Sequence, residues 1–129
     1  MTLTDIFCSY ALILPDTDGI LIAGGTKWTG TEIDGQGNAN STIFKSGDDT
    51  LSLGNDMLRP RWYATATPLM NGEVYVQGGK GGEDLPEVRD TNGVFRTLTG
   101  ALTGSFSWWY PFNFLGPDGR VFGFDSAGL

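Results

Sequence analysis

The stretch RPRWYATATPLMNGEVYVQGG, residues Arg59–Gly79, has the pattern of a β-strand, a tight turn and a second β-strand. Short apolar runs flank Asn71-Gly72, and an Asn-Gly pair supplies the positive φ angles that a tight hairpin turn requires. The second strand closes on the double glycine Gly78-Gly79. This stretch therefore predicts a β-hairpin.

The same pattern recurs along the chain. The turn glycines are Gly19, Gly72 and Gly119, which gives a period of about 50 residues. After the first two copies the sequence predicts a second hairpin, turning at Gly47-Asp48 and at Asn92-Gly93. Four strands per repeat are typical of a propeller blade, and the period with its double glycine favours the kelch class. The three copies are SYALILPDTDGILIAGG (Ser9–Gly25), YATATPLMNGEVYVQGG (Tyr63–Gly79) and YPFNFLGPDGRVFGFD (Tyr110–Asp125).

We therefore expect an all-β fold: a kelch-type β-propeller segment of about two and a half four-stranded blades within residues 1–129. The expected units are residues 6–55, residues 60–100 and a half blade over residues 106–126. An open ring leaves apolar blade faces uncovered, and such patches usually mark an interface. The chain is thus expected to be a homo-oligomer, for example a closed ring of about five blades from two chains, or to pair with the remainder of a larger propeller.

Composition limits the partners. With 8 basic and 15 acidic residues the net charge is -7, which repels phosphate backbones and argues against nucleic acid. No apolar run is long enough to span a membrane, and no basic residue precedes the first apolar run, so we expect no membrane association and no signal peptide in this chain. A lone cysteine, Cys8, excludes an internal disulfide.

Two segments, DIFCSYALILPDTDGILIAGG and MLRPRWYATATPLMNGEVYVQGG, resemble the copper radical oxidases, a family that includes galactose oxidase and glyoxal oxidase. The resemblance implies a thioether between the cysteine of Phe7-Cys8 and Tyr63, with Cys8 and Tyr63 as catalytic residues and Tyr63 as a copper ligand. The form Arg61-Trp62-Tyr63 looks more like glyoxal oxidase. The complete family enzyme oxidises primary alcohols or aldehydes and produces hydrogen peroxide, which implies a carbohydrate or small-aldehyde ligand and an extracellular location.

The pairing has a physical reason. An ortho thioether and metal coordination both stabilise an oxidised phenol ring, so metal and tyrosine can share two electrons. The inner strands of a propeller converge on its axis, and we therefore expect Cys8 and Tyr63 to be neighbours. Taken alone, a tyrosine heading an inner strand is often a packing residue, which is how we interpret Tyr110, and a lone cysteine is usually a small buried hydrophobe.

The family's copper site also takes two imidazoles and a second, axial tyrosine, as the resemblance implies. This sequence has no histidine, so we expect no copper to be bound by this chain alone. Galactose-oxidising members stack an aromatic ring over the thioether, and here Lys80 stands in its place. Two function classes stay open: a portion of a copper radical oxidase that carries the Cys-Tyr pair, and a non-catalytic kelch-type binding or structural module.

Two further motifs give weaker indications of a binding site. The segment PDTDG, with Asp16 and Asp18, resembles the start of a calcium loop but is interpreted as a hairpin turn. Trp108 and Trp109 precede Tyr110 and could form a sugar-stacking platform, although one of them matches the packing tryptophan that precedes Tyr63.

Overall fold

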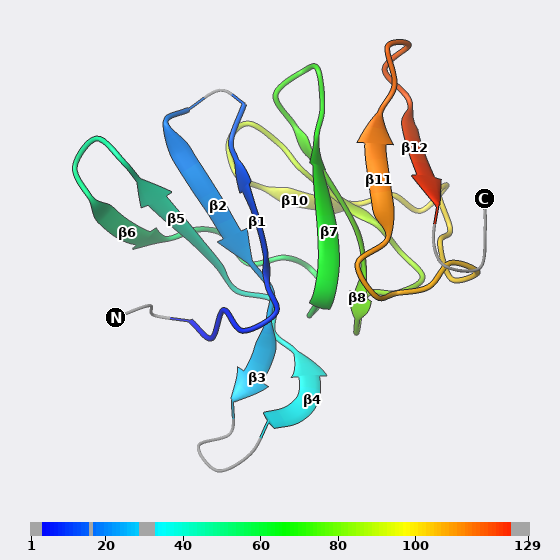
Figure 1. Cartoon of the computed structure of the whole chain (residues 1–129), viewed down its shortest axis with the longest axis horizontal. Coiled ribbons are helices and arrows are strands. Elements are labelled where there is room, and N and C mark those ends of the chain that lie inside the picture. The colour runs from blue at the N-terminus through cyan, green and yellow to red at the C-terminus, as the bar shows by residue number, and fades with distance from the viewer. Residues whose placement is uncertain (1–3, 16, 29–32, 125–129) are drawn as a thin grey trace.

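The computed structural model describes residues 4–15, 17–28 and 33–124, and every regular element among them is a β-strand. Two four-stranded antiparallel sheets follow one another along the chain (Figure 1). The first has the order β1-β2-β5-β6 and the second the order β10-β9-β8-β7. The strands of the first sheet are β1 (Tyr10–Ile13), β2 (Gly19–Ala23), β5 (Ser41–Lys45) and β6 (Thr50–Leu53); those of the second are β7 (Trp62–Pro68), β8 (Val74–Lys80), β9 (Glu87–Arg89) and β10 (Phe95–Thr97).

Two further hairpins complete the described strands: β3 (Thr26–Trp28) with β4 (Ile33–Gly37), and β11 (Phe112–Leu115) with β12 (Val121–Phe124). All five predicted hairpins are confirmed as antiparallel pairs. They are β1–β2, β5–β6, β7–β8, β9–β10 and β11–β12. The hairpin β3–β4 was not predicted; it leaves the first sheet directly after Gly24-Gly25 and returns before β5.

Three turn glycines adopt the conformation for which the sequence selects them, whereas Gly19, in the first copy, does not have a positive φ. Gly72, Gly93 and Gly119 have φ angles of 83°, 87° and 80°. These values lie in the left-handed region, which glycine enters without steric cost. The chain therefore reverses at these points without strain. In the β5–β6 turn the left-handed residue is instead Asp49, with φ 53°.

The first strands of successive units lie side by side, in the order β1, β7, β11, and the remaining strands of each sheet fan away from that row (Figure 1). The hydrophobic core lies between the two large sheets and includes Leu21, Val74 and Val76, all with no exposed surface. Apolar blade faces were expected to stay uncovered, but these residues of β2 and β8 are buried between the two sheets. The phenylalanines of the β11–β12 hairpin do remain exposed: Phe112 by 57%, Phe114 by 55% and Phe122 by 51%.

The double glycines let consecutive units approach closely. A Cβ atom on Gly24 would lie 2.4 Å from the Arg61 carbonyl oxygen, and one on Gly78 would lie 2.9 Å from the Pro111 ring. These are separations that real Cβ atoms do not reach, so a side chain would force the units apart. Instead, Gly25 donates its N–H to the Arg61 carbonyl at 2.9 Å, and Gly79 donates its N–H to the Trp108 carbonyl at 2.8 Å. These bonds hold the chain two residues before Tyr63 and two residues before Tyr110.

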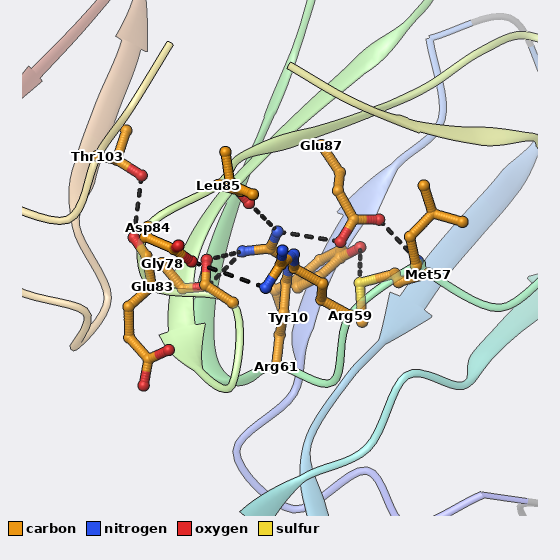
Figure 2. Close-up of polar contacts among 12 residues, drawn as sticks. Tyr10, Met57, Arg59, Arg61, Gly78, Glu83, Asp84, Leu85, Glu87 and Thr103 are labelled. Atoms are coloured by element: carbon orange, nitrogen blue, oxygen red, sulfur yellow. Dashed lines mark hydrogen bonds and ion pairs between the residues drawn. The ribbon is translucent and has the colours of Figure 1, made fainter. Parts of the chain in front are cut away.

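Arg61 is fully buried and ties the second sheet together (Figure 2). Its guanidinium donates to the carbonyl oxygens of Gly78 and Gly82 at 2.6 and 2.8 Å, and to that of Leu85 at 2.5 Å. It also forms an ion pair with Glu87 at 3.0 Å, and the Glu87 side chain is equally buried. The second Glu87 oxygen accepts the N–H of Leu58 at 2.8 Å, so the buried carboxylate is paired on both sides.

Among the residues that the structure describes, no helix is long and apolar enough to cross a membrane.

Candidate functional site

Cys8, Tyr63 and Tyr110 occupy equivalent places at the entrance of the first strand of each unit. All three have left-handed backbones, with φ angles of 59°, 68° and 42°. Tyr63 donates its N–H to the carbonyl of Cys8 at 3.2 Å, and Tyr110 donates its N–H to the carbonyl of Tyr63 at 2.8 Å. We call this chain of bonds the entrance ladder. It brings together residues that are far apart in the sequence.

The left-handed conformation at these positions is informative because it is costly. A residue with a Cβ atom and a large side chain rarely adopts positive φ, at a cost of about 1–3 kcal/mol, and such strain persists only where the surroundings enforce it. Here the same strain occurs at one place in three successive units. The ladder and the double-glycine contacts enforce it, and the result is that the backbones of the three residues lie side by side.

The sequence-predicted pair is brought into contact. The side-chain hydrogen bond between Tyr63 and Cys8 raises the pKa of the Tyr63 phenol, with smaller contributions from burial, from the charge of Cys8 and from Tyr110. Burial raises the pKa of Tyr110, and the Cys8 thiol raises it further through its charge and a side-chain hydrogen bond. Both phenols therefore stay protonated at neutral pH.

Aromatic rings surround Tyr63. Trp109 stacks on it with ring centroids 4.8 Å apart and an interplanar angle of 16°. Trp62 lies at 4.6 Å with a tilt of 41°, and Tyr110 stands edge-on at 5.1 Å and 89°. Trp108 is more distant, at 6.3 Å. The Tyr63 ring is thus in contact with aromatic surface on several sides.

Trp109 supplies an aromatic ring stacked on Tyr63 that the sequence did not predict. The expected position of a stacking ring is held by Lys80, which pairs with Trp62 across β7 and β8. The stacked ring comes instead from the segment that enters the next unit. Tyr110, which we interpreted as a packing residue, is 42% exposed and lies in the same group as Cys8 and Tyr63. The pattern of two tryptophans before a tyrosine was the available signal for this cluster.

The donor set at this point does not by itself suit copper. The described residues contain no group of three or more histidine, cysteine, aspartate or glutamate side chains that could hold a metal ion. Cys8, Tyr63 and Tyr110 offer a thiol and two protonated phenols, whereas copper(II) prefers a tetragonal site with nitrogen ligands. The sequence supplies no imidazole. Two phenols and a sulfur do not make a complete copper site.

The structure describes the PDTDG motif only in part. Asp16 is outside the described residues, and Asp18 is an exposed turn residue. Asp18 borders a cavity of about 610 Å³ between the two large sheets, which Leu14 and Ile43 line on its apolar side and Lys45 and Arg89 on its basic side.

Comparisons with known proteins find that this chain is similar to parts of two longer proteins. A scan against models of known protein families finds no match. The chain is 35% identical over 91 residues to a WSC domain-containing protein of Arthroderma benhamiae (strain ATCC MYA-4681 / CBS 112371), an alignment that covers 63% of this chain and 9% of that protein.

The fold is similar to that of a solved fungal alcohol oxidase of the AA5 family, in complex with copper. The superposition has a TM-score of 0.69 at 15% sequence identity and covers 95% of this chain and 26% of that one. The chain thus spans a small part of the length of both proteins, and the structural likeness shows the fold. The resemblance to the copper radical oxidases that the sequence indicated is therefore found again in three dimensions.

Proposed function

We propose that the chain is a kelch-type propeller segment of a galactose- or glyoxal-oxidase-like copper radical oxidase, and that it carries the Cys-Tyr cofactor pair. In this proposal each four-stranded sheet is a blade and β11–β12 is the inner hairpin of a third. The blades correspond to residues 6–55, 60–100 and 106–126. The likeness in fold to an AA5 alcohol oxidase supports the architecture.

One observation carries the proposal: Cys8 and Tyr63 occupy equivalent strand entrances and are joined there by the bond from the Tyr63 N–H to the Cys8 carbonyl at 3.2 Å. Coupling them breaks the S–H bond of Cys8 and a ring C–H bond ortho to the Tyr63 hydroxyl, and forms one C–S bond. Two electrons and two protons leave, and dioxygen accepts them as hydrogen peroxide. The product is a phenol that is easier to oxidise than tyrosine because the ortho sulfur stabilises the oxidised ring.

The chain's own residues would have distinct tasks in the complete protein. Tyr63 would supply one phenolate oxygen to copper, and the metal would supply the second one-electron centre. Trp109, stacked on Tyr63, would keep water from the ring face. The remaining metal ligands would come from residues outside this sequence. The substrates would be primary alcohols or aldehydes, including carbohydrates, in an extracellular setting, as the family resemblance implies.

Peptide mass mapping tests the proposal directly. Trypsin releases Cys8 in residues 1–27 and Tyr63 in residues 62–80, and a thioether joins these peptides at their summed mass less two hydrogens, about 2 Da. We expect this species in protein isolated from its source, and no such species in Cys8→Ser. The Tyr110→Phe variant should retain it, because its coupling partner is intact. A source-isolated protein with free Cys8 and separate peptides would refute the proposal.

A second function class has its own support. The described donors do not complete a copper site, which favours a non-catalytic kelch-type binding or structural module. That alternative predicts unlinked peptides in the natural protein and no peroxide from any alcohol or aldehyde. Under either alternative, we expect the 129-residue chain supplied with copper to oxidise no alcohol. Peroxide from pure, histidine-tag-free chain would contradict this expectation.

Both alternatives require a partner for the β11–β12 hairpin. In the two complete sheets a third strand pairs with the second, whereas β12 pairs only with β11 among the described strands. Its neighbouring phenylalanines are more than half exposed. We propose that the remainder of a larger propeller or a second copy of the chain covers this hairpin. Light scattering on the purified chain tests this: a monodisperse monomer would contradict it.

A further inference from the structure

We propose that Trp109 is an electron-transfer residue that connects Tyr63 to the protein surface, where a one-electron acceptor can reach it. Four aromatic rings lie in contact in the order Trp62, Tyr63, Trp109 and Trp108, and we call them the aromatic path. This inference rests on the proposed function, in which Tyr63 is a one-electron redox group, and it names the route by which Tyr63 is oxidised.

The spacing of the rings permits electron transfer between them. Neighbouring ring centroids along the aromatic path are 4.6, 4.8 and 4.7 Å apart, and Trp109 stacks on Tyr63 with an interplanar angle of 16°. Aromatic rings at such separations are in direct contact. An electron can therefore pass from one ring to the next without crossing solvent or a saturated side chain.

The chemistry of the rings suits the same task. Indoles and phenols give up one electron far more readily than a benzene ring does, and every member of the aromatic path is an indole or a phenol. The stacked rings of Phe112 and Phe124, 5.2 Å apart, lack this property. A phenol loses its proton as it gives up an electron at neutral pH, which makes Tyr63 the residue on which the oxidation comes to rest.

The aromatic path leads from the interior to the surface. The indole nitrogen of Trp62 is buried, whereas Trp109 is 55% exposed. Aromatic residues that serve the core are enclosed, as Phe95 is at 5% exposure, so packing in the core does not explain Trp109. An electron acceptor in solution can meet the Trp109 ring while that ring stacks on Tyr63.

Electrons and protons balance in this transfer. The acceptor takes one electron from Trp109 and leaves an indole radical cation. Tyr63 then gives one electron to that indole and releases its hydroxyl proton to water. Trp109 is thereby restored, and Tyr63 remains as a neutral tyrosyl radical. In the complete protein this step would supply the oxidised Tyr63 that the proposed function requires.

The chain contains a matched tryptophan outside the aromatic path. Trp28 is 56% exposed, against 55% for Trp109, but no ring contact joins it to another aromatic residue in the part of the chain that the structure describes. A diffusing oxidant therefore meets the two indoles about equally often. Only an oxidised Trp109 has a tyrosine in contact that can restore it, so about half of the indole radicals should convert into tyrosyl radical.

Laser flash photolysis tests this on the full chain without copper. Tris(bipyridine)ruthenium(II) is excited beside hexaammineruthenium(III), which accepts one electron, and the resulting tris(bipyridine)ruthenium(III) oxidises exposed indoles. Absorption spectra then follow the fraction of the indole-radical signal that becomes tyrosyl-radical signal at a rate independent of protein concentration. Trp28→Phe should raise this fraction about twofold and Trp109→Phe should lower it about twofold, because the oxidant then meets mainly the other indole.

Two features of the variants separate electron transfer from packing. Trp109→Phe keeps an aromatic ring at the stacked position, and circular dichroism would confirm that the sheets are retained. Tyr63→Phe should lower the converted fraction as Trp109→Phe does, whereas Tyr110→Phe should leave it at the native value. Equal fractions in Trp28→Phe and Trp109→Phe would overturn the inference, as would full conversion in Tyr63→Phe.

The outcome can be told apart from that of the proposed function. Peptide mapping of source-isolated protein decides whether the thioether forms, and flash photolysis needs neither the thioether nor a metal. A protein without the thioether would refute the proposed function even if Trp109 passes electrons to Tyr63. Absence of any conversion in the native sequence would overturn the inference even if the thioether is present.

Discussion

Replacing Arg61 with methionine tests whether the buried ion pair stabilises the second sheet. Methionine has nearly the volume of the arginine stem but no charge and no donors. The substitution leaves Glu87 without its cation and removes the donor to the carbonyls of Gly78, Gly82 and Leu85. Both side chains have no exposed surface, so water cannot replace the lost partner.

The expected cost follows from that geometry. Removing one partner of a buried pair destabilises a protein by about 3–5 kcal/mol, because an uncompensated charge stays inside. That is a large share of the stability of an ordinary domain, about 5–15 kcal/mol. For a chain of this size it corresponds to a fall in the melting temperature of roughly 10–20 °C. Urea unfolding followed by tryptophan fluorescence would measure it.

The chain offers a matched control. Arg96 pairs with Glu73 at 2.9 Å, a shorter distance than in the buried pair, but its side chain is 50% exposed. Arg96→Met should therefore cost only about 0–1 kcal/mol. Combining Arg61→Met with Glu87→Leu should recover part of the loss, because no charge is then left buried. A cost below about 1.5 kcal/mol for Arg61→Met, or a double variant no more stable than the single one, would refute this reasoning.

Three further outcomes are expected. Burial raises the pKa of Tyr75 to about 12, so its contribution to the free energy of unfolding should be fully present below pH 10 and decline as pH rises from 10 towards 12. Absorbance at 295 nm would follow the ionisation of the phenol and circular dichroism the loss of structure. Tyr75→Phe should lessen the decline. In urea unfolding, Gly78→Ala should lower the free energy of unfolding at least twice as much as Gly119→Ala. Both glycines have positive φ, but only at Gly78 would a Cβ atom collide with a neighbouring residue. Equal losses in the two variants would contradict this. Trp109→Leu should expose the Tyr63 ring and raise its iodination rate about threefold, as one aromatic stack is lost.

Much of the fold could be predicted because local chemistry determines it. The Asn-Gly and Asp-Gly turns require positive φ, and the strands beside them alternate, so the hairpins and even the bounds of β12 (Val121–Phe124) follow from the sequence. The β3–β4 hairpin was missed for a local reason as well. Its second strand carries Gly35 and Gly37, and glycine weakens the strand pattern.

The site was less predictable because it depends on how units pack. The Cys8–Tyr63 contact could be expected, since equivalent places in adjacent units converge. The burial of Arg61 could not, because arginine is almost never fully buried without a partner and the partner, Glu87, lies on another strand. The stack of Trp109 on Tyr63 likewise arises from the approach of two units, which no local pattern encodes.

The entrance ladder has a consequence for how such a centre could change over time. The bonds that hold Cys8, Tyr63 and Tyr110 in place run between backbone atoms, and the adjoining glycines add backbone bonds of their own. None of these bonds depends on which side chain the three positions carry. Each repeat therefore contributes one residue position to a shared centre. The backbone around that position keeps its shape when the side chain is replaced. In evolution, single substitutions at these positions could add or remove a thiol or a phenol while the surrounding sheets stay unchanged.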